Sequence, residues 1–164
     1  MNILEGKEKL RETSEKFSEQ LNEGERIQEE GEETDRIVAT IDTSGLDSDT
    51  VEATRQVEGD LSSAYTEKIS EVEEGVEQTA ETASGHVESL GENRERVNQN
   101  AEKYAEAAGV SEISRAAADA GKSKMESDSE QYGELIQENE QQMEQSRESA
   151  KNMSSVIKGL FKRG

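Results

Sequence analysis

Apolar and small residues recur every seven positions through the first forty residues of this chain. The first row consists of Ile3, Leu10, Phe17, Gly24, Gly31 and Val38, and a second row three residues further on contains Thr13, Ile27, Thr34 and Ile41. A seven-residue repeat with two such rows is typical of a helix that packs lengthwise against another helix. An interior glycine costs a helix about 0.5 to 1 kcal/mol, but at a packing seam it allows a neighbouring helix to approach closely. The spacing predicts a first helix over residues 2–41.

A second row of apolar or small residues continues with a period of about 3.6, which predicts a nearly straight helix. Its members are Leu61, Tyr65, Ile69, Val72, Val76, Ala80, Ala83, Val87, Leu90, Val97, Ala101, Tyr104 and Ala108, with Arg94 as the one charged residue. The preceding stretch DTSGLDSDTVE (42–52) breaks the first pattern at Gly45 and offers Asp47, Ser48 or Asp49 as the helix N-cap. A second helix is therefore predicted over residues 48–108.

The stretch AAGVSEIS (107–114) shifts the phase again, with Gly109 placed as a C-cap and Ser111 as the next N-cap. The third row runs through Val110, Ile113, Ala117, Ala120, Tyr132, Leu135, Met143, Ala150, Met153, Ile157 and Leu160. The polar residues Asp128, Asn139 and Gln142 interrupt it, so we expect its middle to be the loosest part. A third helix is predicted over residues 111–161.

Composition agrees with helices that bury only a thin core. Leu, Ile, Val and Phe provide 27 of the 164 residues, and the formal net charge is -20. Such values occur in disordered chains, but this chain lacks proline and its apolar residues are regularly spaced. We therefore expect an all-α, elongated antiparallel bundle of three long coiled-coil-like helices, with residues 1–164 as a single helical unit.

The three predicted helices differ in length, at roughly 60, 90 and 75 Å. If the first two pair from their connecting turn, the first ends before the second, and residues near 90–130 form a two-helix hairpin. This end is rich in alanine, which allows close helix approach but buries little surface. We expect a partner helix to bind here, either from another protein or from a second copy of this chain. The candidate partner-binding residues are Ala101, Tyr104, Ala108, Ile113, Ala117 and Ala120.

The sequence offers little for catalysis. His86 is the one histidine, cysteine is absent, and we find no glycine-rich phosphate loop and no zinc or nucleophile motif. We expect His86 to face solvent and the protein to be neither an enzyme nor the holder of a metal or cofactor. The acidity also argues against nucleic acid, which requires clustered Lys and Arg.

The segment AKNMSSVIKGLFKRG (150–164) differs in charge from the rest of the chain, because it contains four bases and no acid. As a helix it would be amphipathic, through Met153, Val156, Ile157, Lys158, Leu160, Phe161, Lys162 and Arg163. Four interpretations remain open at this stage. The apolar face completes the bundle, with its bases suited to a helix C-terminus, or it is a docking signal, a membrane-surface anchor or an inert disordered end.

No run approaches the ~20 apolar residues that span a bilayer, and Met1 is followed by neither a basic nor an apolar signal segment. The expected location is cytoplasmic, or outside the cell by a route that uses no cleavable signal peptide.

The straight, cysteine-free, acidic hairpin resembles the WXG100 and LXG-associated small proteins of bacterial type VII secretion. LEG, at Leu4 to Gly6, is similar to their Leu-x-Gly element, and AAGVS is similar to their hairpin turn. The chain has no tryptophan, and none of Tyr65, Tyr104 and Tyr132 has an acid four residues on. The resemblance therefore implies a partner or chaperone-like protein for a secreted effector.

Two further hypotheses belong to other classes. The 13 glycines and the mean hydropathy of -1.01 suit a self-assembling or stress-protective hydrophilic protein. The basic C-terminal segment suits a peripheral binder of membrane surfaces. The leading hypothesis is a non-enzymatic helical adaptor.

Overall fold

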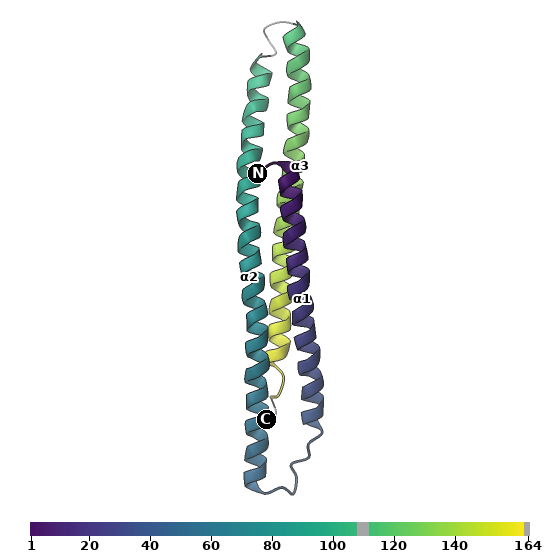
Figure 1. Ribbon diagram of the computed structural model, residues 1–164, viewed down its shortest axis with the longest axis vertical. Helices are drawn as coiled ribbons and strands as arrows, with labels where there is room; N and C mark the ends of the chain where they lie inside the picture. The colour runs from purple at the N-terminus through teal and green to yellow at the C-terminus, as the bar shows by residue number, and fades with distance from the viewer. Residues whose placement is uncertain (108–111, 163–164) are drawn as a thin grey trace. The chain divides into compact units, whose positions relative to one another are not determined.

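In a computed structural model, which describes residues 1–107 and 112–162, the chain folds into three α-helices (Figure 1). The helices are α1 (Ile3–Ala39), α2 (Ser48–Ala107) and α3 (Glu112–Lys158), with 37, 60 and 47 residues. No strand occurs in the described part of the chain. The helices pack against one another, so the predicted all-α bundle is confirmed, and the predicted order of lengths is confirmed as well.

Side chains fix where the first two helices begin. Asn2 caps α1, because its Oδ1 accepts a hydrogen bond from the Glu5 backbone N–H at 2.8 Å. Asp47 caps α2 in the same way, through the Thr50 backbone N–H at 2.7 Å, which selects one of the three predicted caps. In the preceding turn Gly45 adopts a φ of 83°, a conformation that favours glycine.

The predicted helix ends extend too far in two places. α1 ends at Ala39 rather than residue 41, and α3 ends at Lys158 rather than residue 161. Phe161 has a φ of 61°, in the left-handed region, which a continuing right-handed helix does not allow. Residue 108, the predicted end of the second helix, and residue 111, the predicted start of the third, lie outside the described residues.

Contacts within the chain define two compact units, and each helix contributes to both. Unit 1 consists of Met1–Glu15 and Ala80–Glu144, and unit 2 consists of Lys16–Thr79 and Gln145–Gly164. Within each unit the contacts place α1 parallel to α3 and antiparallel to α2. In unit 2, for example, Gly24 lies against Met153 and Gly31 against Leu160.

Unit 1 has its core where α1 meets the other two helices. Leu90, Tyr132 and Leu135 form a buried cluster, and partly buried hydrophobic residues of α1 and its neighbours pack against it. The partly buried residues that pack against the cluster are Met1, Ile3, Leu10, Val97 and Ile136. A Cβ on Gly6 would lie 2.8 Å from Leu90 Cδ2 and 3.1 Å from Leu135 Cδ1, so this glycine brings α1 into direct contact with the cluster.

In unit 2 the two glycines of the first heptad row lie at the seam. A Cβ on Gly24 would lie 2.6 Å from Met153 Sδ, and one on Gly31 would lie 3.1 Å from Leu160 Cδ1. The expectation that these glycines allow close helix approach is therefore confirmed. A polar contact joins α1 to α2 in the same unit, where Gln20 Nε2 donates to Thr79 Oγ1 at 2.9 Å.

Candidate interaction site

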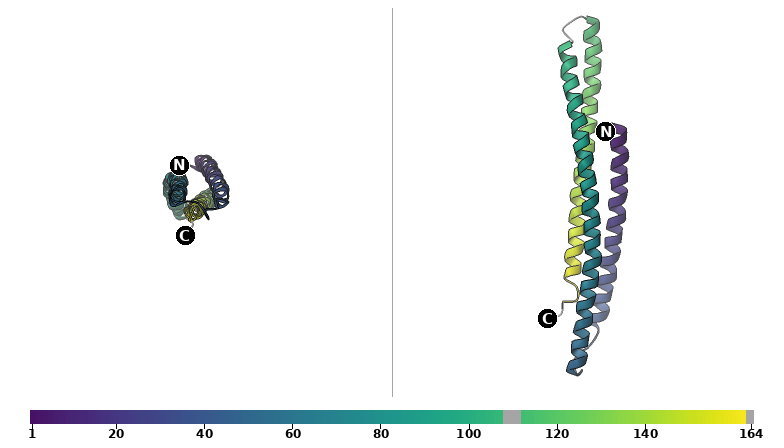
Figure 2. Two further views of the ribbon diagram at one scale, coloured as in Figure 1. Left: turned by 90° about the horizontal axis from the view of Figure 1, so that it is seen from below. Right: turned by 60° about the vertical axis from the view of Figure 1, so that its left-hand side comes forward.

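The N-terminus of α1 stops partway along the α2–α3 pair of unit 1. The Met1 carbonyl accepts hydrogen bonds from Asn93 Nδ2 and, at 3.5 Å, from the Tyr132 hydroxyl. Beyond these two residues α2 and α3 continue without α1, as Figure 2 shows. We call residues 94–107 and 112–131 the two-helix arm. The predicted hairpin near 90–130 is therefore present in unit 1.

At the end of the two-helix arm nearest to α1, Arg94 links α2 to α3. Its Nε donates to Ser129 Oγ at 3.2 Å, which joins α2 to α3. A Cβ on Gly133 would lie 3.0 Å from Arg94 Nη2, so glycine at this position leaves room for the guanidinium. The one charged residue of the second apolar row thus crosses to the neighbouring helix.

Further out, the arm keeps its two helices close through Tyr104. The ring of this residue would lie 3.2 Å from a Cβ on Gly121, yet Tyr104 remains 43% exposed. Ala118 is buried between the helices, at 3% exposure. The arm therefore has a packed inner side, while a large aromatic ring stays open to solvent.

Burial along the seam changes where α1 ends. Under α1, Leu90 is 0% exposed and Tyr132 is 6% exposed. One heptad further along each helix, Val97 and Met125 are only half-buried. The next members are Tyr104 on α2, which is 43% exposed, and Ala118 on α3, which the two helices bury without α1 at 3% exposure. The same seam thus continues past Met1 without a third helix to cover it.

The predicted partner-binding residues fall on this arm with different exposure. Ala101 is half-buried, whereas Tyr104, Ala117 and Ala120 are exposed. Ala108 lies outside the described residues, and the side chain of Ile113 is not described. Sequence reasoning missed Gly121 and Met125, although both follow by seven-residue steps from Leu135 and Tyr132.

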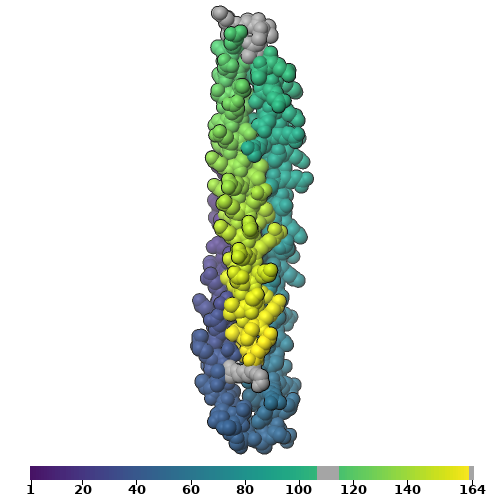
Figure 3. Space-filling view, turned by 180° about the vertical axis from the view of Figure 1, so that it is seen from behind, coloured from purple at the N-terminus to yellow at the C-terminus, as the bar shows by residue number. Residues whose placement is uncertain are grey.

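The C-terminal segment lies in unit 2, where Figure 3 shows the end of α3 (yellow) between α1 and α2. Met153, Ile157 and Phe161 are buried at 8%, 0% and 6% exposure. Leu160 is half-buried, and Val156, Lys158 and Lys162 are exposed, while Arg163 lies outside the described residues. The apolar face of this segment packs within unit 2, so little of it remains for a membrane.

After α3 ends, Phe161 contacts both other helices of unit 2. Its backbone N–H donates to Asp35 Oδ1 at 3.0 Å, and its ring stacks on Tyr65 with centroids 5.9 Å apart. Tyr65 also exchanges a hydrogen bond with Thr34 at 3.1 Å. These contacts give the last described residues a structural role.

The substitution Phe161→Ala should lower the free energy of unfolding by about 3 kcal/mol, because it removes a buried aromatic ring and leaves a cavity. Urea titration followed by circular dichroism measures this change. Val156→Ala is the matched control, since Val156 is 40% exposed, and we expect it to stay within about 0.5 kcal/mol of wild type. Equal effects of the two substitutions would contradict the assigned packing.

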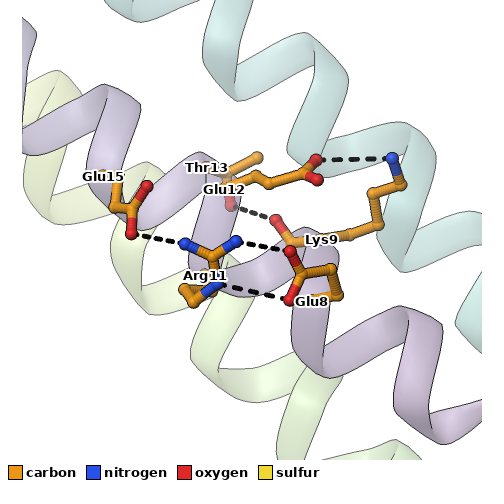
Figure 4. A network of polar contacts seen from close by, with 6 residues as sticks. All are labelled: Glu8, Lys9, Arg11, Glu12, Thr13 and Glu15. Atoms are coloured by element: carbon orange, nitrogen blue, oxygen red, sulfur yellow. Dashed lines mark hydrogen bonds and ion pairs between the residues drawn. The ribbon is translucent and has the colours of Figure 1, made fainter.

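Figure 4 shows a network of polar contacts along α1, in which the pair of Lys9 and Glu12 lies toward α2. Arg11 contacts Glu15 at 2.6 Å and also pairs with Glu8, whose pKa it lowers mainly through the hydrogen bond. Lys9 pairs with Glu12 at 3.3 Å. About half of each of these side chains is exposed to solvent, so the ion pairs contribute little to the stability of the fold.

His86 is half-buried, which corrects the expectation that it faces solvent. Its Nδ1 is buried and has no hydrogen-bond partner among the described residues. Burial lowers the pKa of His86, and the charge of Lys9 lowers it further while Glu12 opposes the shift. His86 comes one position before Val87 of the second apolar row, so spacing alone did not show that α1, which carries Lys9 and Glu12, lies close to it.

The larger hollows of the described surface are open grooves between helices. One of about 640 Å³ in unit 1 has Leu10 and Leu135 among its lining residues, with charged side chains such as Lys7 and Glu134 beside them. Within residues 1–107 and 112–162, no group of three or more His, Cys, Asp or Glu is placed to hold a metal ion.

Comparison with known proteins gives no family for this chain: no protein-family model, curated protein or solved structure matches it. Among the described residues, no helix combines the length and apolar character that crossing a bilayer requires.

Proposed function

We propose that this protein is a non-enzymatic helical adaptor that binds a protein partner through the two-helix arm. One observation carries the proposal. Beyond the part of the seam that α1 buries, Val97 and Met125 are only half-buried and Tyr104 is 43% exposed, although Ala118 of α3 stays buried within the arm. Half-buried apolar residues at heptad spacing are stabilised when a further helix packs on them.

The charge of the arm supports a protein as the ligand. Residues 94–107 and 112–131 contain six bases and eight acids, whereas the whole chain contains 19 bases and 39 acids. The arm thus has nearly balanced charges within a strongly acidic chain. A balanced surface does not concentrate nucleic acid or an anionic membrane, but it permits the close approach of another helix.

The resemblance to the small proteins of type VII secretion supplies a candidate class of partner. In that proposal the arm binds a helix of a secreted bacterial effector and keeps it ready for export. Leu4, in the LEG element, is 78% exposed, whereas Gly6 is buried against the unit 1 core. Export itself, and any effector, are part of the proposal.

The experiment places a photo-crosslinking amino acid at Tyr104 in cells that make the protein naturally. We expect one discrete cross-linked protein, identified by mass spectrometry, and its loss when Ala101→Glu and Ala117→Glu are added. The same crosslinker at Leu4, an exposed position of α1, is the matched control. Equal capture from both positions, or capture unaffected by the two Glu substitutions, would contradict the proposal.

Light scattering after size exclusion tests the self-assembly alternative. An adaptor with a free arm should have the mass of one chain, 18.1 kDa, over a wide concentration range. A dimer that grows with concentration would favour the structural hypothesis instead.

A further inference from the structure

We infer that the occupant of the arm is a single amphipathic helix that follows on from α1 and completes a three-helix arrangement there. This inference rests on the proposed function, because it names the kind of partner that the same arm binds. Unit 1 already contains one interface of this kind, where α1 packs on α2 and α3; we call it the α1 seat.

One helix is enough to bury the apolar cluster at this interface. In unit 1, α1 alone covers the cluster around Leu90 and Leu135, which are 0% and 5% exposed. Gly6 allows the required approach, since a Cβ there would lie 2.8 Å from Leu90. Helices α2 and α3 continue past Met1, so the surface on which α1 packs continues along the two-helix arm. A single helix in line with α1 would cover this surface.

The spacing of the open seam defines the length of the occupant. The α2 row repeats every seven residues through Leu90, Val97 and Tyr104. The α3 row repeats through Tyr132, Met125 and Ala118, of which Ala118 is already buried within the arm at 3% exposure. The part beyond Met1 therefore extends over about two heptads, which corresponds to roughly 14 residues and 21 Å of helix. The partner helix must carry apolar or small residues at its two seam positions over this length.

The side chains of the arm define what those positions should be. Tyr104 packs its ring against Gly121 of α3 and remains 43% exposed, while Ala101 is small and half-buried. A helix packed on this surface therefore needs a small residue beside the Tyr104 ring and a larger aliphatic residue beside Ala101. The flanking charges of the arm are nearly balanced, so the partner helix should carry both signs beside its seam.

A second copy of this chain fits the seat less well. Its arm consists of two helices, whereas in the rest of unit 1 a single helix, α1, is enough to cover α2 and α3. The second copy would also bring its own net charge of -20 near an equally acidic chain, and like charges repel at these distances unless salt screens them.

The test extends α1 with a known helix, so that it does not depend on finding the partner. Residues 3–16, ILEGKEKLRETSEK, are copied once and inserted directly before Ile3 in the full-length chain, which continues the seven-residue repeat for two heptads. Hydrogen exchange is then measured over the arm. We expect its amides to exchange at least about tenfold more slowly than in a control extension.

In the control extension the copied Ile3 and Leu10 are both replaced by Asp. The two extended chains therefore have the same length, and both lose the contacts of Met1 with Asn93 and Tyr132. A third variant combines the apolar extension with Tyr104→Glu and should lose the added protection. Equal exchange in the apolar and control extensions would overturn the one-helix seat. Protection of the unextended arm that rises with protein concentration would also overturn it, in favour of a second copy.

The two proposals fail separately. If crosslinking at Tyr104 identifies a partner but the extension adds no protection, the adaptor function stands and the single-helix occupant is wrong. If the extension protects the arm but no partner is captured, the seat exists and the adaptor function is contradicted.

Discussion

Leu90→Ala should lower the free energy of unfolding by about 3 kcal/mol. Leu90 is fully buried, in a cluster with Tyr132 and Leu135, and α1 closes over it at Gly6. Removing its isobutyl end leaves a cavity that close-packed neighbours fill only in part, so the lost transfer energy and the cavity add. Urea titration with circular dichroism measures the change.

Leu4→Ala is the matched control for this substitution. It removes the same atoms from a leucine of the same unit, but Leu4 is 78% exposed. We expect its effect to remain within about 0.5 kcal/mol. Equal costs of the two substitutions would contradict the burial of Leu90 under α1.

The helices themselves could be predicted from sequence because each row of apolar or small residues repeats over many turns, even where single polar residues interrupt it. Rows such as Ile69, Val76 and Leu90 on α2 turned out to be buried, and the turn around Gly45 lies between α1 and α2 as predicted. The end of α3 could not be predicted, because the periodicity continues through Phe161. Only the structure shows that this residue turns away from helical geometry to meet Asp35 and Tyr65.

The arm was predictable for a different reason, namely arithmetic on helix lengths. Its alanines suggested the place, yet the half-buried residues that continue the seam are Val97 and Met125, neither of which was among the predicted site residues. Single-sequence spacing gives each helix its apolar face but does not say where a neighbouring helix stops. That point depends on the contacts of Met1 with Asn93 and Tyr132.

Gly24→Val should destabilise the protein by about 2 kcal/mol, although valine is the better helix former. A Cβ at this position would lie 2.6 Å from Met153 Sδ and 3.3 Å from Val72 Cγ1, and valine adds two methyl groups beyond it. Met153 is able to shift, but Val72 is β-branched and buried at 7% exposure, so α1 must move away from the seam. Urea titration measures the result.

Gly59→Val is the matched control, because no atom lies within 4 Å of a Cβ built on Gly59 of α2. Here only the helix propensity changes, and we expect a gain of about 0.3 kcal/mol. The opposite signs of the two substitutions follow from one physical difference, which is whether the glycine lies at a helix seam or on an open face. If Gly24→Val also stabilised the protein, α1 could not be seated closely on α2 and α3 in unit 2. The glycines at positions 24 and 31 would then be breaks in the first heptad row rather than contact points.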